Sequence, residues 1–82
     1  MAKEIKLIEF TPYLATAYIE GFAEGASATG EQQIQAWAYL IKEKIVWGLQ
    51  GAYGRQATAF IESGVINAEG EIDWDIYKEI LK

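Results

Sequence analysis

The 82-residue sequence contains no cysteine and no histidine. Without cysteine, no disulfide can compensate for the small core of a short chain, and an oxidising compartment has no support. Without histidine, the commonest general base and the commonest metal ligand are both missing. No serine, threonine or lysine stands at a spacing that sets a nucleophile beside a base. We therefore expect no catalytic residue, no metal site, no cofactor and no enzymatic activity.

Basic residues are scarce as well. Seven Lys and Arg stand against twelve Asp and Glu, which gives a net charge of −5, and the only arginine is Arg55. Nucleic-acid binding needs basic side chains that neutralise phosphates, so a nucleic-acid partner is disfavoured. No apolar run reaches the roughly 18 residues that a membrane-spanning helix needs, and charges interrupt the N-terminal segment. We expect no contact with a membrane and a cytoplasmic location.

Apolar residues make up 51% of the sequence, with three Trp, five Tyr and three Phe, as in a globular protein. The length fits one small domain over residues 1–82. Apolar residues at helical spacing predict helices over 12–23, from about 30 to 43, and from 45 to about 63. A short helix is predicted after Asp73, which can act as its N-cap. The sequence predicts an all-α fold, a small bundle of three main helices plus the short C-terminal helix.

The predicted helix ends have capping signals. Thr11 precedes Pro12, and Thr29 with Gln32 matches a capping box. Gly64 is a candidate C-cap, and residues 67–71 form a predicted turn. Two points stay open. The N-terminal segment 4–10 is an extended arm or a short strand, and residues 42–46 contain no breaker that would separate the second helix from the third.

The stretch "WGLQGAYGRQA", residues 47–57, places three glycines inside the third predicted helix. Each glycine there costs roughly 0.8–1 kcal/mol relative to alanine. On a continuous helix, small residues and Arg55 would share one face and form a shallow trough with a guanidinium in its floor. The candidate binding residues are those in or beside this trough: Arg55, Gly51, Gly48, Tyr53, Trp47, Gln50, Ala52 and Ala59.

Two interpretations of the trough follow. In the first, another helix of this chain or of a second copy packs into it, and Arg55 pairs with Glu20 or Glu24. In the second, the trough binds an external group, with Arg55 gripping a carboxylate or phosphate between Trp47 and Tyr53. Both hold if the partner is another copy, which would make the protein a homo-oligomer.

The segment from Thr16 to Ile66 resembles a family of short, uncharacterised proteins that are encoded mostly by bacteriophages and prophages. Its pattern is "LI" followed by "W-x-LQG-x-YGR-x-A-x-x-LI-x-x-G". The matching residues are Leu40, Ile41, Trp47, Leu49, Gln50, Gly51, Tyr53, Gly54, Arg55, Ala57, Ile61 and Gly64. After "LI" the family usually shows a polar pair and a glycine, whereas this chain has Lys42–Lys44. The resemblance implies a phage origin and an accessory or host-takeover role, without an activity.

These observations lead to a functional hypothesis. The protein is expected to be a non-enzymatic phage accessory protein in the host cell cytosol, which inhibits a host defence or host-takeover target by contact with a host or phage protein. An alternative is an oligomeric sponge that sequesters a nucleotide signal, which makes an anionic small molecule the second candidate ligand. A DNA-binding tri-helical module ranks last because of the net charge.

Overall fold

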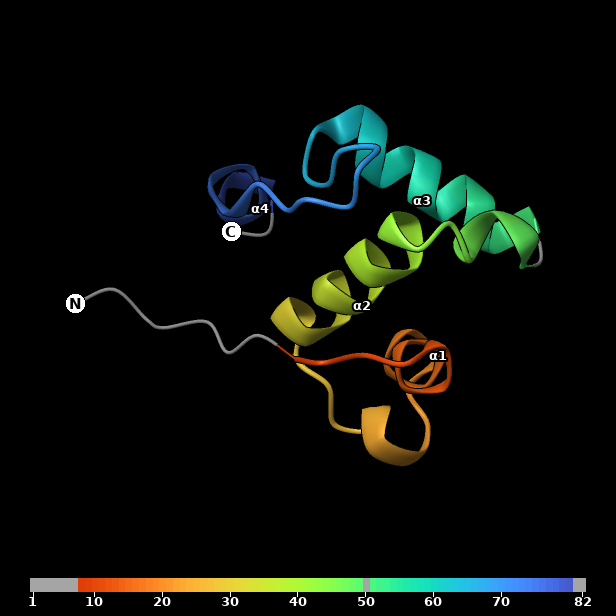
Figure 1. Ribbon diagram of the computed structural model, residues 1–82. Coiled ribbons are helices and arrows are strands. Elements are labelled where there is room, and N and C mark those ends of the chain that lie inside the picture. The colour runs from red at the N-terminus through yellow and green to blue at the C-terminus, as the bar shows by residue number, and fades with distance from the viewer. Residues whose placement is uncertain (1–7, 50, 81–82) are drawn as a thin grey trace.

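The computed structural model describes residues 8–49 and 51–80, and this part of the chain is mostly helical. In chain order the elements are α1 (Pro12–Glu20), the 3-10 turn η1 (Ala23–Gly25), α2 (Gly30–Lys42), the 3-10 turn η2 (Val46–Gly48), α3 (Gly51–Ser63) and α4 (Trp74–Ile80). Figure 1 shows α2 in the centre, with α1 on one side and α3 on the other. Residues 8–10 of the predicted arm form neither helix nor strand, and its residues 4–7 lie outside the described residues.

The first two helices begin where their capping residues predict. Thr11 Oγ1 accepts a hydrogen bond from the Leu14 amide at 3.1 Å, ahead of α1. Before α2, Thr29 Oγ1 accepts from the Gln32 amide at 3.2 Å, and Gln32 Oε1 accepts from the Thr29 amide at 2.8 Å. Each bond satisfies a backbone donor that has no partner inside the helix. The predicted capping box is therefore confirmed.

The ends of α1 and α2 are set by residues in the left-handed backbone region. Gly21, at φ 78°, donates its N–H to the Ala17 carbonyl at 2.8 Å and ends α1 at Glu20. The predicted end at residue 23 is wrong, and Phe22 lies outside the helix. After α2 the chain turns through Lys44, whose φ is 62°. The second and third helices are thus separate.

The predicted continuous helix from residue 45 is also wrong, because α3 begins at Gly51. Val46–Gly48 form a 3-10 turn, and Leu49 is extended with ψ −178°. The core explains this turn. The Ile45 N–H bonds to the Leu40 carbonyl at 2.9 Å, and the chain then turns so that Val46 is fully buried. Burying such a side chain contributes roughly 1.5–3 kcal/mol, which favours the turn over a longer helix.

The core is centred on α2. This helix alone supplies Ile34, Ala36, Ala38, Leu40 and Ile41, all buried, because α1 and α3 flank it. The other buried apolar residues of the core come from the flanking elements: Ala15, Val46, Ala57, Val65 and Ile66.

A compact loop joins α3 to α4. Gly64 follows the last residue of α3 with φ 85°, as expected for a C-cap. An isolated antiparallel bridge joins Ile66 to Ile72, and Asn67 Oδ1 accepts backbone N–H groups inside the predicted turn at 2.9 and 3.0 Å. Asp73 Oδ1 then accepts two amides of the first turn of α4 at 3.1 Å. The predicted turn and the predicted Asp73 cap are confirmed.

Candidate functional site

Four of the predicted trough residues share one side of α3. Gly51, Ala52, Arg55 and Ala59 are spaced at three and four residues, and all are exposed. We call this surface the Arg55 face. Gly48 does not belong to it, because Gly48 ends the 3-10 turn η2 before the helix begins. Its assignment to a common helical face is therefore wrong.

No described segment of the chain packs onto this face. Among the described residues, a Cβ added at Gly51 would meet only Nη1 of Arg55, at 3.4 Å, and one added at Gly48, which precedes the face, would have open space around it. Within residues 8–49 and 51–80, Arg55 makes no ion pair, so its predicted pairing with Glu20 or Glu24 is wrong. The Arg55 guanidinium instead lies back over Gly51, in the first turn of α3.

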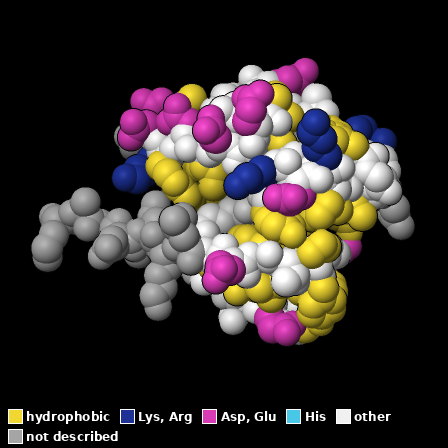
Figure 2. Space-filling view, viewed as in Figure 1, with side chains coloured by type: hydrophobic (Ala, Val, Ile, Leu, Met, Phe, Trp, Pro, Cys, Tyr) yellow, Lys and Arg dark blue, Asp and Glu magenta, His cyan; other side chains and the backbone are white. Residues whose placement is uncertain are grey.

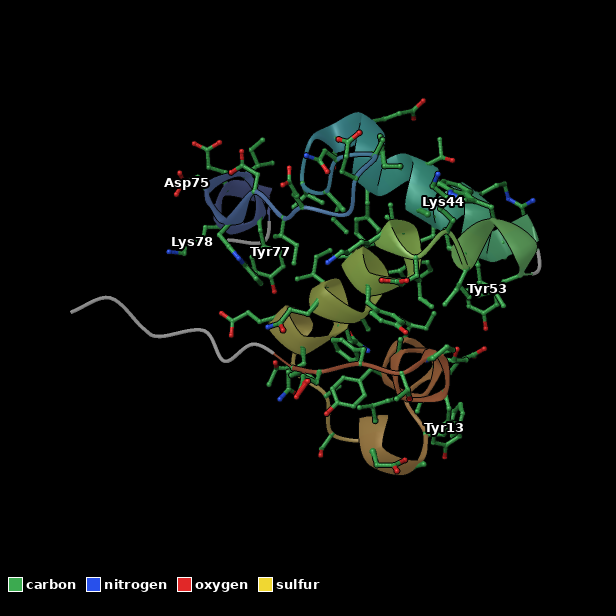
Figure 3. The ribbon with its side chains drawn as sticks, in the orientation of Figure 1. Tyr13, Lys44, Tyr53, Asp75, Tyr77 and Lys78 are labelled. Atoms are coloured by element: carbon green, nitrogen blue, oxygen red, sulfur yellow. The ribbon has the colours of Figure 1, made fainter. Side chains whose placement is uncertain are left out.

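The two aromatic residues predicted to wall the trough lie in different environments. Trp47 is 49% exposed, and its Cε3 atom lies 3.9 Å from the position of a Cβ on Gly54. Tyr53 is half-buried, and its ring centroid lies 6.1 Å from that of Trp37. Tyr53 thus packs against α2 rather than beside the Arg55 face (Figure 3). Gln50, the remaining predicted residue, lies outside the described residues.

The start of α3 adds backbone donors to the Arg55 face. The first N–H groups of a helix have no acceptor within it, and the helix dipole makes this end positive. Because α3 begins at Gly51, the Arg55 side chain folds back onto this first turn, with Nη1 3.4 Å from the position of a Cβ on Gly51. The arrangement can donate hydrogen bonds to a carboxylate or phosphate as well as pack against a protein surface.

Two hollows lie near the C-terminal half of α3. A cavity of about 170 Å³ adjoins the Arg55 face at Ala59. It is lined by Ile34, Gln56, Ala59, Phe60, Ser63, Val65 and Tyr77. A more open hollow of about 530 Å³ is lined by Gly64, Asn67, Glu71, Ile72, Asp73, Trp74 and Asp75. Figure 2 shows the Asp and Glu side chains gathered on this side of the molecule, over α4 and the loop before it.

Tyr77 is the titratable residue whose environment is most distinct. It projects from α4 toward the start of α2, and its hydroxyl lies 2.8 Å from the position of a Cβ on Gly30 (Figure 3). Burial raises the pKa of the Tyr77 hydroxyl above its ordinary value, and the negative charge of Glu31 raises it further. At neutral pH Tyr77 is therefore a neutral hydrogen-bonding group at the edge of the smaller cavity.

Sequence reasoning missed a second surface. Tyr13 and Phe22 are 56% and 43% exposed, and their ring centroids lie 6.2 Å apart. The periodicity of α1 assigned Phe22 to the apolar stripe of a helix that in fact ends before it. The glycine at position 21 was the available signal, since glycine commonly ends a helix in the left-handed region.

The described residues contain no group of three or more His, Cys, Asp or Glu side chains that could hold a metal ion. None of their helices combines the length and the apolar character required to cross a lipid bilayer.

The chain is similar to a known protein family. Residues 22–81 match the family described as "Domain of unknown function (DUF7417)". The chain belongs to this family. The family match contains the Arg55 face, both hollows and Phe22, whereas α1 with Tyr13 precedes it. No curated protein and no solved structure matches the chain.

Proposed function

We propose that this small helical bundle is a non-enzymatic bacteriophage accessory protein. It binds a host or phage protein in the host cytosol through the Arg55 face, and thereby inhibits a host defence or host-takeover target. The observation that carries the proposal is the exposure of this face, with Arg55 free of any ion pair to the described residues and Trp47 nearby. The phage assignment rests on the resemblance of the segment from Thr16 to Ile66 to a family encoded mostly by bacteriophages and prophages.

The residue types on this surface suit a protein partner. Gly51, Ala52 and Ala59 carry little side-chain bulk, so a partner can approach the α3 backbone closely. Arginine and tryptophan are the residue types that most often dominate binding energy at interfaces, and Arg55 and Trp47 supply one of each. An arginine that has no ion pair can also bind a carboxylate of the partner with two parallel hydrogen bonds.

Replacing Arg55 tests the proposal. Arg55→Ala is expected to weaken capture of the partner from host-cell lysate at least about tenfold, the effect of losing an interface hot spot. Its melting temperature should stay within about 2 °C of wild type, because exposed side chains contribute little to stability. Lys78→Ala, which removes a positive charge from α4, is the matched control and should bind normally. Normal capture by Arg55→Ala would refute the proposal.

No described segment of the chain covers the Arg55 face. A second copy of the chain can therefore bind there, in addition to the target protein. Light scattering after size exclusion measures the number of copies. Gly51→Leu places a branched side chain at the N-terminal end of the Arg55 face, under the Arg55 guanidinium, and should convert a homo-oligomer to a monomer. A wild-type protein that is monomeric at all concentrations would remove self-association from the proposal.

A nucleotide sponge is the second candidate, and one observation favours it. The Arg55 guanidinium folds back onto the first turn of α3, where a helix has backbone donors without helical acceptors, and a symmetric dimer would bring two such sets together. Titration calorimetry with a panel of cyclic and linear nucleotides separates the two functions. A protein-blocking factor gives no heat, whereas a sponge gives heat that Arg55→Ala abolishes.

A further inference from the structure

The exposed aromatic pair Tyr13–Phe22 lies on a different part of the molecule from the Arg55 face. The two rings meet edge to face, at an interplanar angle of 72°. Figure 2 shows hydrophobic side chains gathered over α1 and the turn that follows it, and Tyr13 points away from the helices in Figure 3. Large hydrophobic side chains that stay exposed together mark interaction surfaces more often than single ones do.

The backbone holds Phe22 in this outward position. Phe22 is extended, at φ −124°, and stands between two residues in the left-handed region, Gly21 at φ 78° and Ala23 at φ 49°. Left-handed geometry is unfavourable for a residue with a Cβ, so the surrounding structure must enforce it at Ala23. Gly25 shows how: it packs so closely on the α1 backbone that an added Cβ would overlap the Ala17 carbonyl. The backbone at Phe22 is thus held in position by its own packing, which reduces the entropic cost of binding there.

The charge around the pair indicates the chemistry of its partner. From residue 8 to residue 41 the sequence contains no lysine and no arginine. Glu20 and Glu24 are exposed and stand two residues before and two residues after Phe22, and the exposed Glu9 stands four residues before Tyr13. An anionic membrane surface or the same acidic patch on a second copy would be repelled. A protein segment that carries apolar side chains between lysines and arginines is attracted by these carboxylates, which we call the acidic rim, and its apolar side chains can cover the two rings.

We propose that the Tyr13–Phe22 pair and its acidic rim form a second docking surface, which binds a basic amphipathic helix of another protein. Such a helix lays its apolar side chains against the rings and its basic side chains against Glu20 and Glu24. This surface is independent of the proposed function, because α1 lies on the other side of α2 from α3 (Figure 1). Tyr13 also precedes the residues that match the family, so the surface is not a property of the matched region alone.

The test uses a synthetic leucine–lysine amphipathic peptide as the probe and a leucine–glutamate peptide of equal length as its control. Calorimetry measures the Kd, and amide chemical shifts map the contact. The Tyr13→Ala/Phe22→Ala double variant should raise the Kd for the basic peptide at least about tenfold. Glu20→Gln/Glu24→Gln should raise it several-fold and reduce its salt dependence. Trp47→Ala, which removes an equally exposed aromatic residue from another surface, should leave the Kd unchanged.

Chemical shifts in the wild-type protein keep the test valid even if a variant loses stability. Perturbed amides confined to residues 11–26 support the proposal. Perturbations confined to 67–79, or an equal loss of affinity in Trp47→Ala, would show that the peptide binds acidic or apolar surface in general and would overturn it. Binding of the leucine–glutamate peptide, or self-association that the double variant abolishes, would overturn it as well, since the occupant would then have different chemistry.

Discussion

Two pairs of glycines in this protein meet opposite surroundings. A Cβ at Gly25 would overlap the backbone of α1, and a Cβ at Gly70 would come within 2.7 Å of the Ala38 carbonyl in α2. Among the described residues, a Cβ at Gly48 would meet nothing, and one at Gly51 would meet only the end of the flexible Arg55 side chain. In the sequence the second pair stands out, because its glycines lie in a predicted helix. In the structure only the first pair is required for packing.

This difference identifies the reason for each glycine. The turns that contain Gly25 and Gly70 lie directly on helix backbones, and no larger residue fits there. At Gly48 and Gly51 no packing within the described residues requires the absence of a side chain. These two positions are therefore open to an external contact, which the proposed function uses.

The largest effect is expected for Gly70→Ala. Gly70 has φ 82°, and the new Cβ would lie 2.5 Å from the Lys42 Cβ as well as close to the α2 backbone. Left-handed strain and overpacking together should lower the free energy of unfolding by about 3–4 kcal/mol. Urea unfolding at neutral pH measures the change. A loss smaller than that of an ordinary surface variant would show that the loop moves away from α2 without cost.

Gly25→Ala should be the next most damaging substitution. Its nearest atoms all belong to the α1 backbone, which cannot turn aside as a flexible side chain does. We expect a loss of about 2–3 kcal/mol, because α1 must shift relative to α2 to admit the methyl group. Amide hydrogen exchange should show the loss of protection concentrated in Pro12–Glu20. Unchanged exchange in that helix would contradict the close approach.

Substitution of Gly48 and Gly51 should change the free energy of unfolding in the opposite direction. The double variant Gly48→Ala/Gly51→Ala should be as stable as wild type or more stable, by up to about 1 kcal/mol, since alanine has less freedom to lose on folding. The same urea experiment checks this, with Gly70→Ala as the reference. If the double variant is destabilised, the two pairs are not different in kind, and the Arg55 face has a structural role.

A smaller gain is expected at Lys44, a residue with a Cβ in the left-handed region at φ 62°. Lys44→Gly relieves the strain but increases the freedom of the unfolded chain, so the net stabilisation should be about 0.5 kcal/mol. Lys44→Ala, which keeps the strain and removes the charge, is the matched control. An equal gain in both variants would assign the effect to the charge rather than to the backbone.

The smallest effect is a pH dependence at Tyr77, whose hydroxyl packs against another glycine, Gly30. The folded pKa of Tyr77 lies above the ordinary value of 10.0. Its contribution to stability is therefore fully present below pH 10 and is lost as the pH rises through the folded pKa. Between about pH 8 and pH 11, Tyr77→Phe should lose less stability than wild type. Identical losses would show that the Tyr77 environment does not distinguish its two protonation states.

Prediction from the sequence worked best where the cause is local. Thr11, Thr29 with Gln32, Gly64 and Asp73 each act on backbone groups within a few residues, and all of these caps are present. The predicted start of the third helix was wrong because the actual start depends on the burial of Val46 among residues distant in the sequence. The prediction of the trough was partly wrong for the same reason. Because α3 begins only at Gly51, Gly48 is not on its face, and Tyr53 packs against Trp37 of α2.

The sequence by itself determined the helical class of the fold, the beginnings of α1, α2 and α4, and the absence of histidine and cysteine side chains, because capping, periodicity and composition do not depend on distant residues. Only the tertiary structure decided where α3 begins, which glycines are packed, and which aromatic and basic side chains remain exposed. The physical reason is that burial is a property of contacts between segments, and neither Gly70 on α2 nor Phe22 beside Tyr13 can be placed until those segments meet.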